Sequence, residues 1–257
     1  MNNSQWWKNG VIYQIYPKSF QDTTGSGTGD IQGIIKRLDY LQTLGIDAIW
    51  ITPMYVSPQI DNGYDIADYR NIDPSYGTMA DFEQLVAEAH KRNIRIVMDM
   101  VFNHSSTFHA WFQKGEDPSS EYHDYYIWRE QPTNWKSKFG GSAWKWSDKA
   151  QQYYLHLFAT EQADLNWENP KLREEIYRMI NWWLDKGIAG FRIDAILNIK
   201  KVFPLRGHDF PPDREDGMAS CTNMIYAAKG IGEFLREMRD RTFRPHGAFT
   251  LGEVLNE

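Results

Sequence analysis

Short apolar runs alternate along the chain with longer segments in which apolar residues recur at helical spacing. The apolar runs predict strands at residues 11–16, 46–51, 94–102, 188–193 and 248–252. The segments between them predict helices at residues 31–44, 79–92, 170–186 and 230–241. Strands that are apolar on both faces are typical of parallel sheets, and strand–helix alternation predicts right-handed βα units.

Two stretches interrupt this alternation. Residues 105–169 are rich in Trp, Tyr, Gly and Ser, and are far longer than the usual connection of about 2–6 residues. We therefore predict a small inserted subdomain (B domain) over one end of the sheet. Residues 203–220 are rich in proline and charge and predict a long surface loop. The expected division is then 1–104 as the first part of a barrel domain, 105–169 as the insertion, and 170–257 as the second part of the barrel.

Five predicted strands are fewer than the eight that close a TIM barrel. The fold class that we expect is α/β, with the N-terminal five βα units of a (β/α)₈ TIM barrel and an insertion after the third strand. The barrel is incomplete in this chain, so we interpret the sequence as the N-terminal portion of a larger protein. Five parallel strands leave two open edges, and open edges invite association. We therefore expect self-association through these edges.

Composition narrows the functional classes. The net charge of −6 argues against a nucleic-acid partner. No apolar run reaches the roughly 18 residues of a membrane span, and the N-terminus lacks a signal-peptide pattern. The single cysteine, Cys221, excludes an internal disulfide and fits a reducing cytoplasm, which is the location we expect. The aromatic content of 15% suits a protein that stacks on the flat faces of sugar rings.

Polar residues cluster where the predicted strands end. Asp99 lies in the third strand and His104 follows it, Asp194 follows the fourth strand, and Glu253 follows the fifth. The carboxyl ends of parallel βα strands form the active face of barrel enzymes. One such carboxylate alone is more often a helix cap or a loop ion pair. Three consecutive strand ends with polar side chains favour an active site.

These motifs resemble a known family. DMVFNH (99–104), GFRIDAI (190–196) and GEV (252–254) resemble signature regions of family 13 glycoside hydrolases, the α-amylase superfamily. IYQIYPKSF, DNGYDIADY, FGGSAW and YYLHLFATEQADLNWENP resemble more narrowly its α-glucosidase branch, which holds oligo-1,6-glucosidases, dextran glucosidases and trehalose-6-phosphate hydrolases. The resemblance covers essentially the whole chain. It implies a retaining exo-α-glucosidase that hydrolyses short α-glucosides such as isomalto- or malto-oligosaccharides and needs no cofactor for its chemistry.

The resemblance implies that Asp194 is the nucleophile and Glu253 the general acid/base. A retaining glycosidase holds two such carboxyl groups about 5–5.5 Å apart, and neighbouring strands are about 4.7–4.9 Å apart. Corresponding ends of adjacent strands therefore suit this pair. Arg192 lies two residues before Asp194 on the same side of the strand, so we expect it to orient Asp194 and keep it ionised.

The resemblance also implies substrate-binding residues. Asp61 would accept hydrogen bonds from sugar hydroxyls, Tyr64 would stack under the glucose ring, and His104 would donate to a hydroxyl. Further residues that match pocket-shaping positions in the insertion are Phe139, Phe158 and Gln162. For these three, core packing is an equal alternative.

The segment 22–30 stands where relatives carry a metal loop. Its oxygen-bearing residues alternate with glycines, as in loops that bind Ca²⁺ or Mg²⁺. The candidate ligands of a structural metal are Asp22, Thr24, Ser26, Thr28 and Asp30. Thr24 and Ser26 replace the Asn and Asp that are common in relatives, which weakens the site. A glycine-rich turn closed by its own side chains is the alternative.

Several alternatives remain open within and beyond this branch. Lys136, Lys138 and Lys145 could supply the phosphate-binding charge of a trehalose-6-phosphate hydrolase, or form a solvated surface. A sucrose isomerase or transglucosidase would share both carboxylates, and a non-catalytic scaffold would lack them. In this branch the residue after the nucleophile is often Val in enzymes that prefer α-1,6 linkages and Thr in those that prefer α-1,4 linkages. Ala195 is neither, so the linkage preference stays open.

Catalytic competence is a separate question. Family 13 enzymes use a third carboxylate in a His-Asp pair beyond the seventh strand, and no such pair can be placed before Glu257. We therefore expect this chain by itself to have little or no glucosidase activity.

Overall fold

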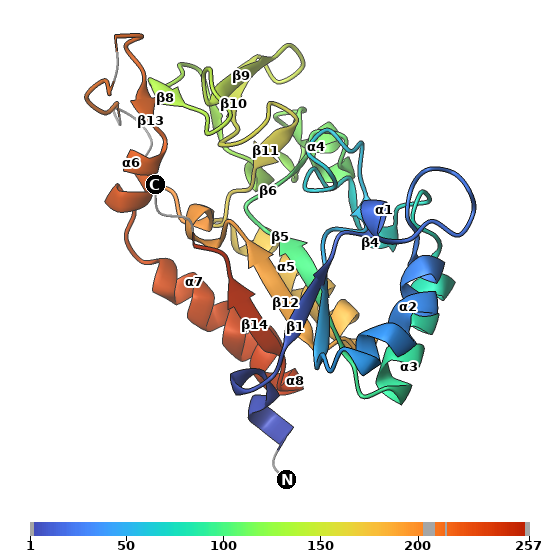
Figure 1. The fold of residues 1–257 in the computed structure, drawn as a ribbon. Coiled ribbons are helices and arrows are strands. Elements are labelled where there is room, and N and C mark those ends of the chain that lie inside the picture. The colour runs from blue at the N-terminus through green and yellow to red at the C-terminus, as the bar shows by residue number, and fades with distance from the viewer. Residues whose placement is uncertain (1–2, 203–208, 214, 255–257) are drawn as a thin grey trace.

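The computed structural model describes residues 3–202, 209–213 and 215–254 (Figure 1). Its centre is a five-stranded sheet in which neighbours in space are also neighbours in the predicted order. In order across the sheet, the strands are β1 (Ile12–Ile15), β2 (Ala48–Ile51), β5 (Arg95–Val101), β12 (Gly190–Asp194) and β14 (Phe249–Gly252). All four pairings are parallel, so the predicted partial barrel is confirmed. β1 and β14 form the two edges.

Three of the four main helices that follow these strands begin at a side-chain cap. The main ones are α2 (Ile31–Thr43), α3 (Met79–Lys91), α5 (Pro170–Asp185) and α7 (Ile231–Met238). The Asp30 carboxylate accepts from the amide of Gly33 at the start of α2, and Thr78 and Asp81 form a reciprocal capping box at the start of α3. The last predicted helix is divided, because α7 continues as a π-helical turn, η4 (Arg239–Phe243), and then as α8 (Arg244–His246).

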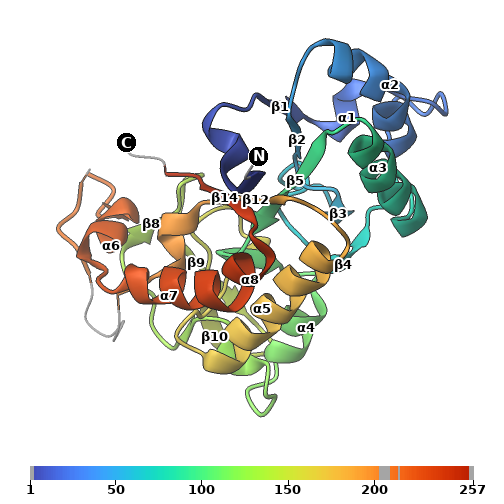
Figure 2. The same cartoon turned by 90° about the horizontal axis from the view of Figure 1, so that it is seen from below.

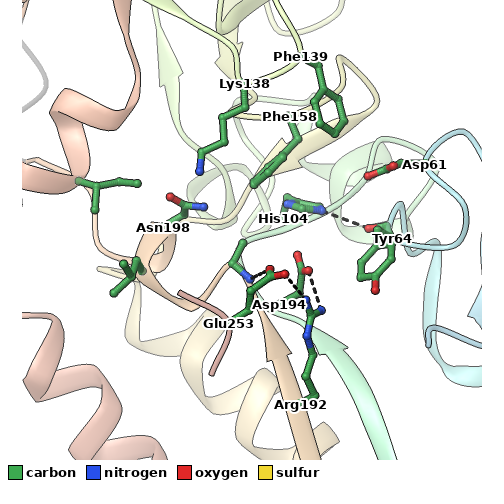
Figure 3. A pocket seen from close by; sticks show the side chains of 13 residues that line it. Asp61, Tyr64, His104, Lys138, Phe139, Phe158, Arg192, Asp194, Asn198 and Glu253 are labelled. Carbon is green, nitrogen blue, oxygen red and sulfur yellow. Dashed lines mark hydrogen bonds and ion pairs between the residues drawn. The ribbon is translucent and has the colours of Figure 1, made fainter. Parts of the chain in front are cut away.

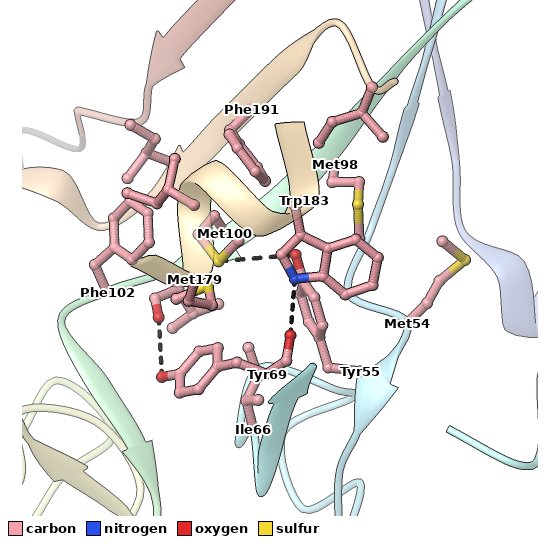
Figure 4. Packing of buried hydrophobic residues seen from close by; sticks show 14 of the residues in the cluster. Met54, Tyr55, Ile66, Tyr69, Met98, Met100, Phe102, Met179, Trp183 and Phe191 are labelled. Atoms are coloured by element: carbon pink, nitrogen blue, oxygen red, sulfur yellow. Dashed lines mark hydrogen bonds between the residues drawn. The ribbon is translucent and has the colours of Figure 1, made fainter. Parts of the chain in front are cut away.

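Aromatic side chains fix the hairpin of β3 (Tyr55–Val56) and β4 (Asp68–Ile72) between α5 and the sheet (Figure 4). The ring of Trp183, on α5, lies 5.6 Å from that of Tyr55, and its indole N–H donates to the Tyr69 carbonyl at 2.8 Å. The Tyr55 hydroxyl donates to the carbonyl of Asp99 on β5 at 2.8 Å. This core therefore holds the third strand in register beneath the polar residues at its end.

The inserted segment forms a second layer over the carboxyl ends of the strands (Figure 1). β6 (His104–Ser106) pairs with β11 (Gln162–Asp164), and a three-stranded antiparallel sheet has the order β7–β10–β9. Its other elements are α4 (Ala110–Gly115), η2 (His123–Tyr125), β7 (Trp128–Arg129), β8 (Trp135–Lys136), β9 (Trp144–Ser147) and β10 (Gln152–Leu155). The insertion has an apolar cluster of its own, which includes Trp135 and Leu155.

The predicted surface loop at 203–220 is confirmed for most of its described part, since residues 209–213 and 215–218 form neither helix nor strand and are mostly exposed. β13 (Ala219–Ser220) pairs with β8, and α6 (Thr222–Ala227) follows. Phe210 stacks on Trp135 at 5.9 Å, and Met224 is buried in the same apolar cluster. Apolar side chains therefore anchor this loop and the following helix on the insertion, where they cover indole surface that water would otherwise reach. Residues 203–208 and 214 lie outside the described part of the chain.

Two tryptophans close the amino-terminal end of the sheet. Trp6 and Trp7, on the short helix η1 (Asn3–Lys8), lie 5.3 and 5.7 Å from Phe249 on β14. Figure 2 shows η1 beside β14 in the view from below. Over the residues that the structure describes, no helix combines the length and apolar character required of a membrane span.

Candidate active site

A cavity of about 300 Å³ opens between the carboxyl ends of the strands and the inserted layer (Figure 3). The side chains that line it are Asp61, Tyr64, His104, Lys138, Phe139, Phe158, Arg192, Asp194, Ala195, Leu197, Asn198, Ile225 and Glu253. The structure thus brings together every residue predicted for catalysis or sugar binding except Gln162. The volume of the cavity lies at the lower end of the range for small-molecule sites, which is about 300–1,000 Å³.

The Arg192 guanidinium is the centre of the charged cluster on the cavity floor. Its Nη1 lies 2.8 Å from Oδ1 of Asp194 and 2.9 Å from Oδ1 of Asp99. Its Nη2 pairs with the carboxylate of Glu253. One buried cation therefore faces three carboxylates, and the two that were expected to react both form ion pairs with it.

Strand register explains this convergence. Arg192 on β12 lies directly opposite Asp99 on β5, so their side chains share a face of the sheet. On the other side, Ile193 is the register partner of Gly252, and the amide of Glu253 donates to the Ile193 carbonyl at 2.9 Å. Asp194 and Glu253 therefore lie at the carboxyl ends of two adjacent strands, β12 and β14, about one strand spacing apart.

The electrostatics of this cluster differ from the expectation that Arg192 keeps Asp194 ionised. Burial, Asp99 and Glu253 together outweigh the guanidinium and raise the pKa of Asp194 to about 8. Burial likewise raises the pKa of Asp99 to about 6, although Arg192 opposes it. With three carboxylates around one cation, the cluster retains a proton at neutral pH.

Asp99 is held from two further directions. The Tyr64 hydroxyl donates to its Oδ2 at 3.0 Å, and the Trp50 indole donates to the same oxygen at 3.1 Å. The Arg192 guanidinium carbon lies 5.1 Å from the centre of the Trp50 ring. Tyr64 is therefore fixed at the cavity wall with its ring available for stacking. We expected a polar role for Asp99 at its strand end, but not this contact to Tyr64.

The wall around His104 is built from hydrogen bonds that join the insertion to the barrel. Burial lowers the pKa of His104 to about 4, so the ring is neutral. Its Nε2 lies 3.1 Å from the Tyr64 carbonyl and 3.1 Å from the Gln162 amide nitrogen. Gln162 is fully buried and donates to Asp61 at 2.9 Å. It therefore acts behind Asp61 and His104 instead of lining the cavity.

A buried lysine behind this wall was missed by the sequence reasoning. Lys201 is 2% exposed, and its Nζ lies 2.7 Å from Oδ1 of Asn103 and 3.1 Å from Oδ1 of Asp164. Asn103 in turn donates to Asp164 at 2.6 Å and contacts Nδ1 of His104 at 3.2 Å. In the sequence Lys201 is half of a Lys-Lys pair, which is typical of a solvated surface. Its partner Asp164 lies in the stretch YYLHLFATEQADLNWENP, where no local pattern links it to Lys201.

Ala195 has a strained backbone at the cavity edge. Its φ of 43° and ψ of 38° are in the left-handed region, which is uncommon for a residue with a Cβ. Its amide donates to Oε2 of Glu253 at 3.1 Å. The turn after β12 therefore directs a backbone donor at the carboxylate that was expected to act as the acid/base.

The three candidate lysines occupy different positions. Lys136 forms an ion pair with Asp216 at 3.0 Å, outside the catalytic cavity. Lys145 is exposed on β9 and lines neither of the two cavities described here. Lys138 lines the cavity that holds Asp194 and Glu253.

The loop at 22–30 is closed by its own groups. Oδ1 of Asp22 accepts from the amides of Thr24 and Gly25 at 2.8 and 2.9 Å, and Oδ2 accepts from that of Gly27 at 2.8 Å. These amides lower the pKa of Asp22 to about 2. The described residues contain no cluster of three or more His, Cys, Asp or Glu side chains arranged for a metal. The donor set favours the turn alternative, and a structural metal stays an untested prediction.

Comparisons with known proteins agree with this geometry. The family described as "Alpha amylase, catalytic domain" matches residues 14–257. The trehalose-6-phosphate hydrolase of Escherichia coli is 55% identical over 255 residues, which are 97% of this chain and 45% of that protein. An oligo-1,6-glucosidase of Halalkalibacterium halodurans is 51% identical over 258 residues, covering 98% and 46%. The chain therefore spans less than half the length of these relatives.

Solved structures show the same similarity. The crystal structure of trehalose-6-phosphate hydrolase from Bacillus licheniformis matches with a TM-score of 0.91 and 50% identity, over 98% of this chain and 45% of that one. An isomaltulose synthase from Erwinia rhapontici matches with a TM-score of 0.91 and 46% identity, with the same coverage of 98% and 45%.

Proposed function

The chain belongs to the α-amylase family, and from this premise we propose that its cavity supports retaining hydrolysis of short α-glucosides. Asp194 is the nucleophile and Glu253 the general acid/base. The observation that carries this proposal is the shared contact of both carboxylates with the Arg192 guanidinium on the cavity floor. A retaining mechanism needs two carboxyl groups that flank the scissile bond about 5–5.5 Å apart, which suits side chains at the ends of adjacent strands.

The reaction takes two displacements. Asp194 attacks the anomeric carbon while Glu253 gives its proton to the leaving glycosidic oxygen, which forms a glucosyl ester on Asp194. Glu253 then takes a proton from water, the water oxygen attacks the anomeric carbon, and Asp194 leaves as a carboxylate that Arg192 stabilises. The proton retained by the carboxylate cluster is the one that the first step uses, and the step requires it on Glu253.

The rest of the cavity binds the glucose. The Tyr64 ring offers a stacking face, and Asp61, held by Gln162, accepts from hydroxyls. We expect His104 to donate a hydrogen bond to a sugar hydroxyl. Because its Nε2 contacts the Tyr64 carbonyl in this structure, the hydroxyl must replace that carbonyl as its partner. Phe158, 5.1 Å from the His104 ring, and the exposed Phe139 cover the opening from the insertion. A pocket of this size supports exo-acting cleavage of short substrates.

A labelling experiment tests the nucleophile directly. We expect 5-fluoro-α-D-glucosyl fluoride to form a stable glucosyl ester on Asp194, because the fluorine slows the hydrolysis of the intermediate more than it prevents its formation. Peptide mass spectrometry of the treated chain locates the added group. Asp194→Asn should stay unlabelled, whereas Asp148→Asn, which changes an exposed carboxylate outside the cavity, should label normally. Label on another residue, or undiminished labelling of Asp194→Asn, contradicts the assignment.

The rate of turnover by this chain depends on whether a third carboxylate is required. The carboxylates that line the cavity in the described part of the chain are Asp61, Asp194 and Glu253, and none belongs to the expected His-Asp pair. We therefore expect slow release of glucose from isomaltose, maltose, sucrose and trehalose 6-phosphate, compared with an intact oligo-1,6-glucosidase. Turnover at the rate of that reference would show that no third carboxylate is required.

Two further proposals concern the protein outside the cavity. Self-association through β1 and β14 is proposed from their position at the sheet edges. A cytoplasmic location is proposed from the single cysteine, Cys221. Fractionation of the producing cells, with the chain detected by antibody, tests this location.

A further inference from the structure

The proton of His104 decides whether this side chain can donate into the cavity. Because burial lowers the pKa of His104 to about 4, the ring is neutral at pH 7 and carries one proton, on Nδ1 or on Nε2. His104 lines the cavity, and the dashed line in Figure 3 joins its Nε2 to Tyr64. A donor for a sugar hydroxyl at this wall therefore requires the proton on Nε2.

The neighbours of Nε2 do not select the tautomer. The Tyr64 carbonyl, which only accepts, and the Gln162 amide nitrogen, which only donates, both lie 3.1 Å from Nε2. The Gln162 amide cannot turn to offer its oxygen, because that oxygen accepts from the Ala159 amide at 2.9 Å while the nitrogen donates to Asp61 at 2.9 Å. One neighbour of Nε2 therefore favours a proton there and the other disfavours it. The choice depends on Nδ1.

The side-chain amide of Asn103 faces Nδ1, and two buried charged groups fix its orientation. Lys201, which follows the short helix η3 (Ile196–Ile199), has donors only, and its Nζ lies 2.7 Å from Oδ1 of Asn103. The Asp164 carboxylate has acceptors only, and its Oδ1 lies 2.6 Å from Nδ2 of Asn103. A flipped amide would place its oxygen against the carboxylate and its nitrogen against the ammonium. The NH₂ group therefore faces Nδ1 of His104, at 3.2 Å.

We propose that Asn103 is a positioning residue that keeps the proton of His104 on Nε2. Its amide donates to Nδ1, which must then be the unprotonated nitrogen. Lys201 and Asp164 act one contact further away, by holding this amide in place. Only the consequence for sugar binding rests on the proposed function, because the tautomer follows from hydrogen bonds within the protein.

Loss of the Asn103 amide should weaken sugar binding through the tautomer. Without it, the ring is left with one donor and one acceptor at Nε2, so the proton is shared between the two nitrogens. A ligand that needs the Nε2–H form binds in proportion to the fraction of molecules that hold it. The Kd should therefore rise by the inverse of that fraction, which is about twofold when the two forms are equally populated.

NMR spectroscopy of the natural chain tests the assignment without any change to the network. In a chain labelled with nitrogen-15 histidine, the protonated ring nitrogen resonates well upfield of the unprotonated one, and couplings to the ring protons distinguish Nδ1 from Nε2. His104→Gln identifies the His104 signals among those of the seven histidines. We expect a protonated Nε2 and an unprotonated Nδ1 at pH 7. A proton on Nδ1 overturns the proposal.

Asn103→Ala tests whether the amide controls the tautomer. We expect the His104 signals to move toward the average of the two forms. The matched control is Asn134→Ala, which removes another amide of the insertion, one that hydrogen-bonds to the backbone of Phe210, and should keep the Nε2–H form. An unchanged Nε2–H form in a folded Asn103→Ala chain shows a merely structural role and overturns the proposal. If this variant does not fold, the spectrum of the natural chain still decides.

Calorimetric titration with 1-deoxynojirimycin, a glucose analogue, connects the tautomer with binding. We expect its Kd to rise in Asn103→Ala by the factor that the measured Nε2–H fraction requires, and to stay the same in Asn134→Ala. A change in Kd without a change in the His104 signals overturns the proposal. The expected tautomers in chains that bind no 1-deoxynojirimycin support the role of Asn103 and overturn the proposed glucose pocket.

Discussion

Arg192 holds three carboxylates close together with only one positive charge. Its guanidinium orients Asp194 and Glu253 but cannot neutralise them together with Asp99. Burial raises the pKa of Asp194, and the nearby carboxylates of Asp99 and Glu253 raise it further. A retaining glycosidase needs one protonated and one ionised carboxyl group, and a cluster that retains a single proton at neutral pH can provide this pair.

The raised pKa of Asp194 makes stability depend on pH. Aspartate has a pKa near 4 in an unfolded chain and about 8 at this position. Between these values the folded protein holds a proton that the unfolded chain has released, so the free energy of unfolding falls as the pH rises. For one proton the slope is at most about 1.4 kcal/mol per pH unit. We expect urea titrations of Asp194→Asn to show a flatter profile than the natural chain between about pH 5 and pH 8.

The control for this profile is Asp148→Asn, at an exposed position remote from the cavity. It should keep the slope of the natural chain. An unchanged slope in Asp194→Asn would show that Asp194 does not hold the proton.

The loop at 22–30 is held closed by hydrogen bonds from its own backbone amides to Asp22. Because the oxygens of Asp22 already accept three backbone amides, the loop needs no cation to fold. We expect the melting temperature to be the same in EDTA and in millimolar calcium or magnesium. A rise with either metal that is absent in Asp22→Asn would instead establish the structural metal.

A buried ion pair connects the insertion with the barrel strands. Lys201 connects the end of η3 with the ends of β5 and β11 through Asn103 and Asp164. Burial lowers the pKa of Lys201, and the adjacent Asp164 opposes that shift. This ion pair therefore links the insertion to the barrel behind His104.

Removal of the Lys201 cation should be costly. Lys201→Met leaves Asp164, which is fully buried, without its charged partner, and such losses typically cost about 3–5 kcal/mol of unfolding free energy. The matched control is Lys200→Met, because the neighbouring Lys200 pairs with Glu168 nearer the surface and should cost about 1 kcal/mol or less. Urea unfolding measures both. Equal losses would show that the buried pair does not stabilise the joint.

A glycine sets the close contact of the last two strands. A Cβ on Gly190 would lie 1.8 Å from the carbonyl oxygen of Phe249 on β14, and its φ is +152°. Gly190→Ala should therefore force β12 and β14 apart and lower the unfolding free energy by about 2 kcal/mol or more.

The comparison for this strand contact is a glycine with free space. A Cβ on Gly232, in α7, would meet no atom within 4 Å, so Gly232→Ala should raise stability by about 0.5–1 kcal/mol. Thermal and urea unfolding would measure the two variants side by side. A mild effect of Gly190→Ala would mean that the strands can separate without loss.

The whole molecule presents two sheet edges that no other described strand covers. β1 and β14 are the outer strands, and exposed apolar side chains lie next to them. Val11 is 55% exposed, Leu251 48% and Val254 54%. Unpaired strand edges with apolar side chains offer hydrogen bonds and apolar surface to a second chain.

Sedimentation velocity tests the association of these edges. We expect the average mass to rise with protein concentration, and Leu251→Lys to shift the equilibrium toward monomer because a charge on an edge strand opposes pairing. Tyr40→Lys, which places a charge at an exposed position of α2 and on neither edge strand, is the control. A monomer at every concentration would contradict self-association through the edges.

The sequence by itself determined the strands, their parallel order and the polar residues at their carboxyl ends. These features follow from local periodicity and from the geometry of βα units, which act over a few neighbouring residues. The position of Asp194, Glu253 and Arg192 at adjacent strand ends was therefore predictable, whereas the pocket around Asp61, Tyr64 and His104 was expected only from the family resemblance.

Only the tertiary structure decided how these groups influence one another. The proton held near Asp194 and the orientation of the Asn103 amide depend on the full set of neighbours in space, and the burial of Lys201 depends on Asp164, which is distant in sequence. The covering of the insertion by Phe210 and Met224 likewise depends on apolar surface contributed by another segment. Burial and charge coupling are sums over the folded environment, so no local pattern contains them.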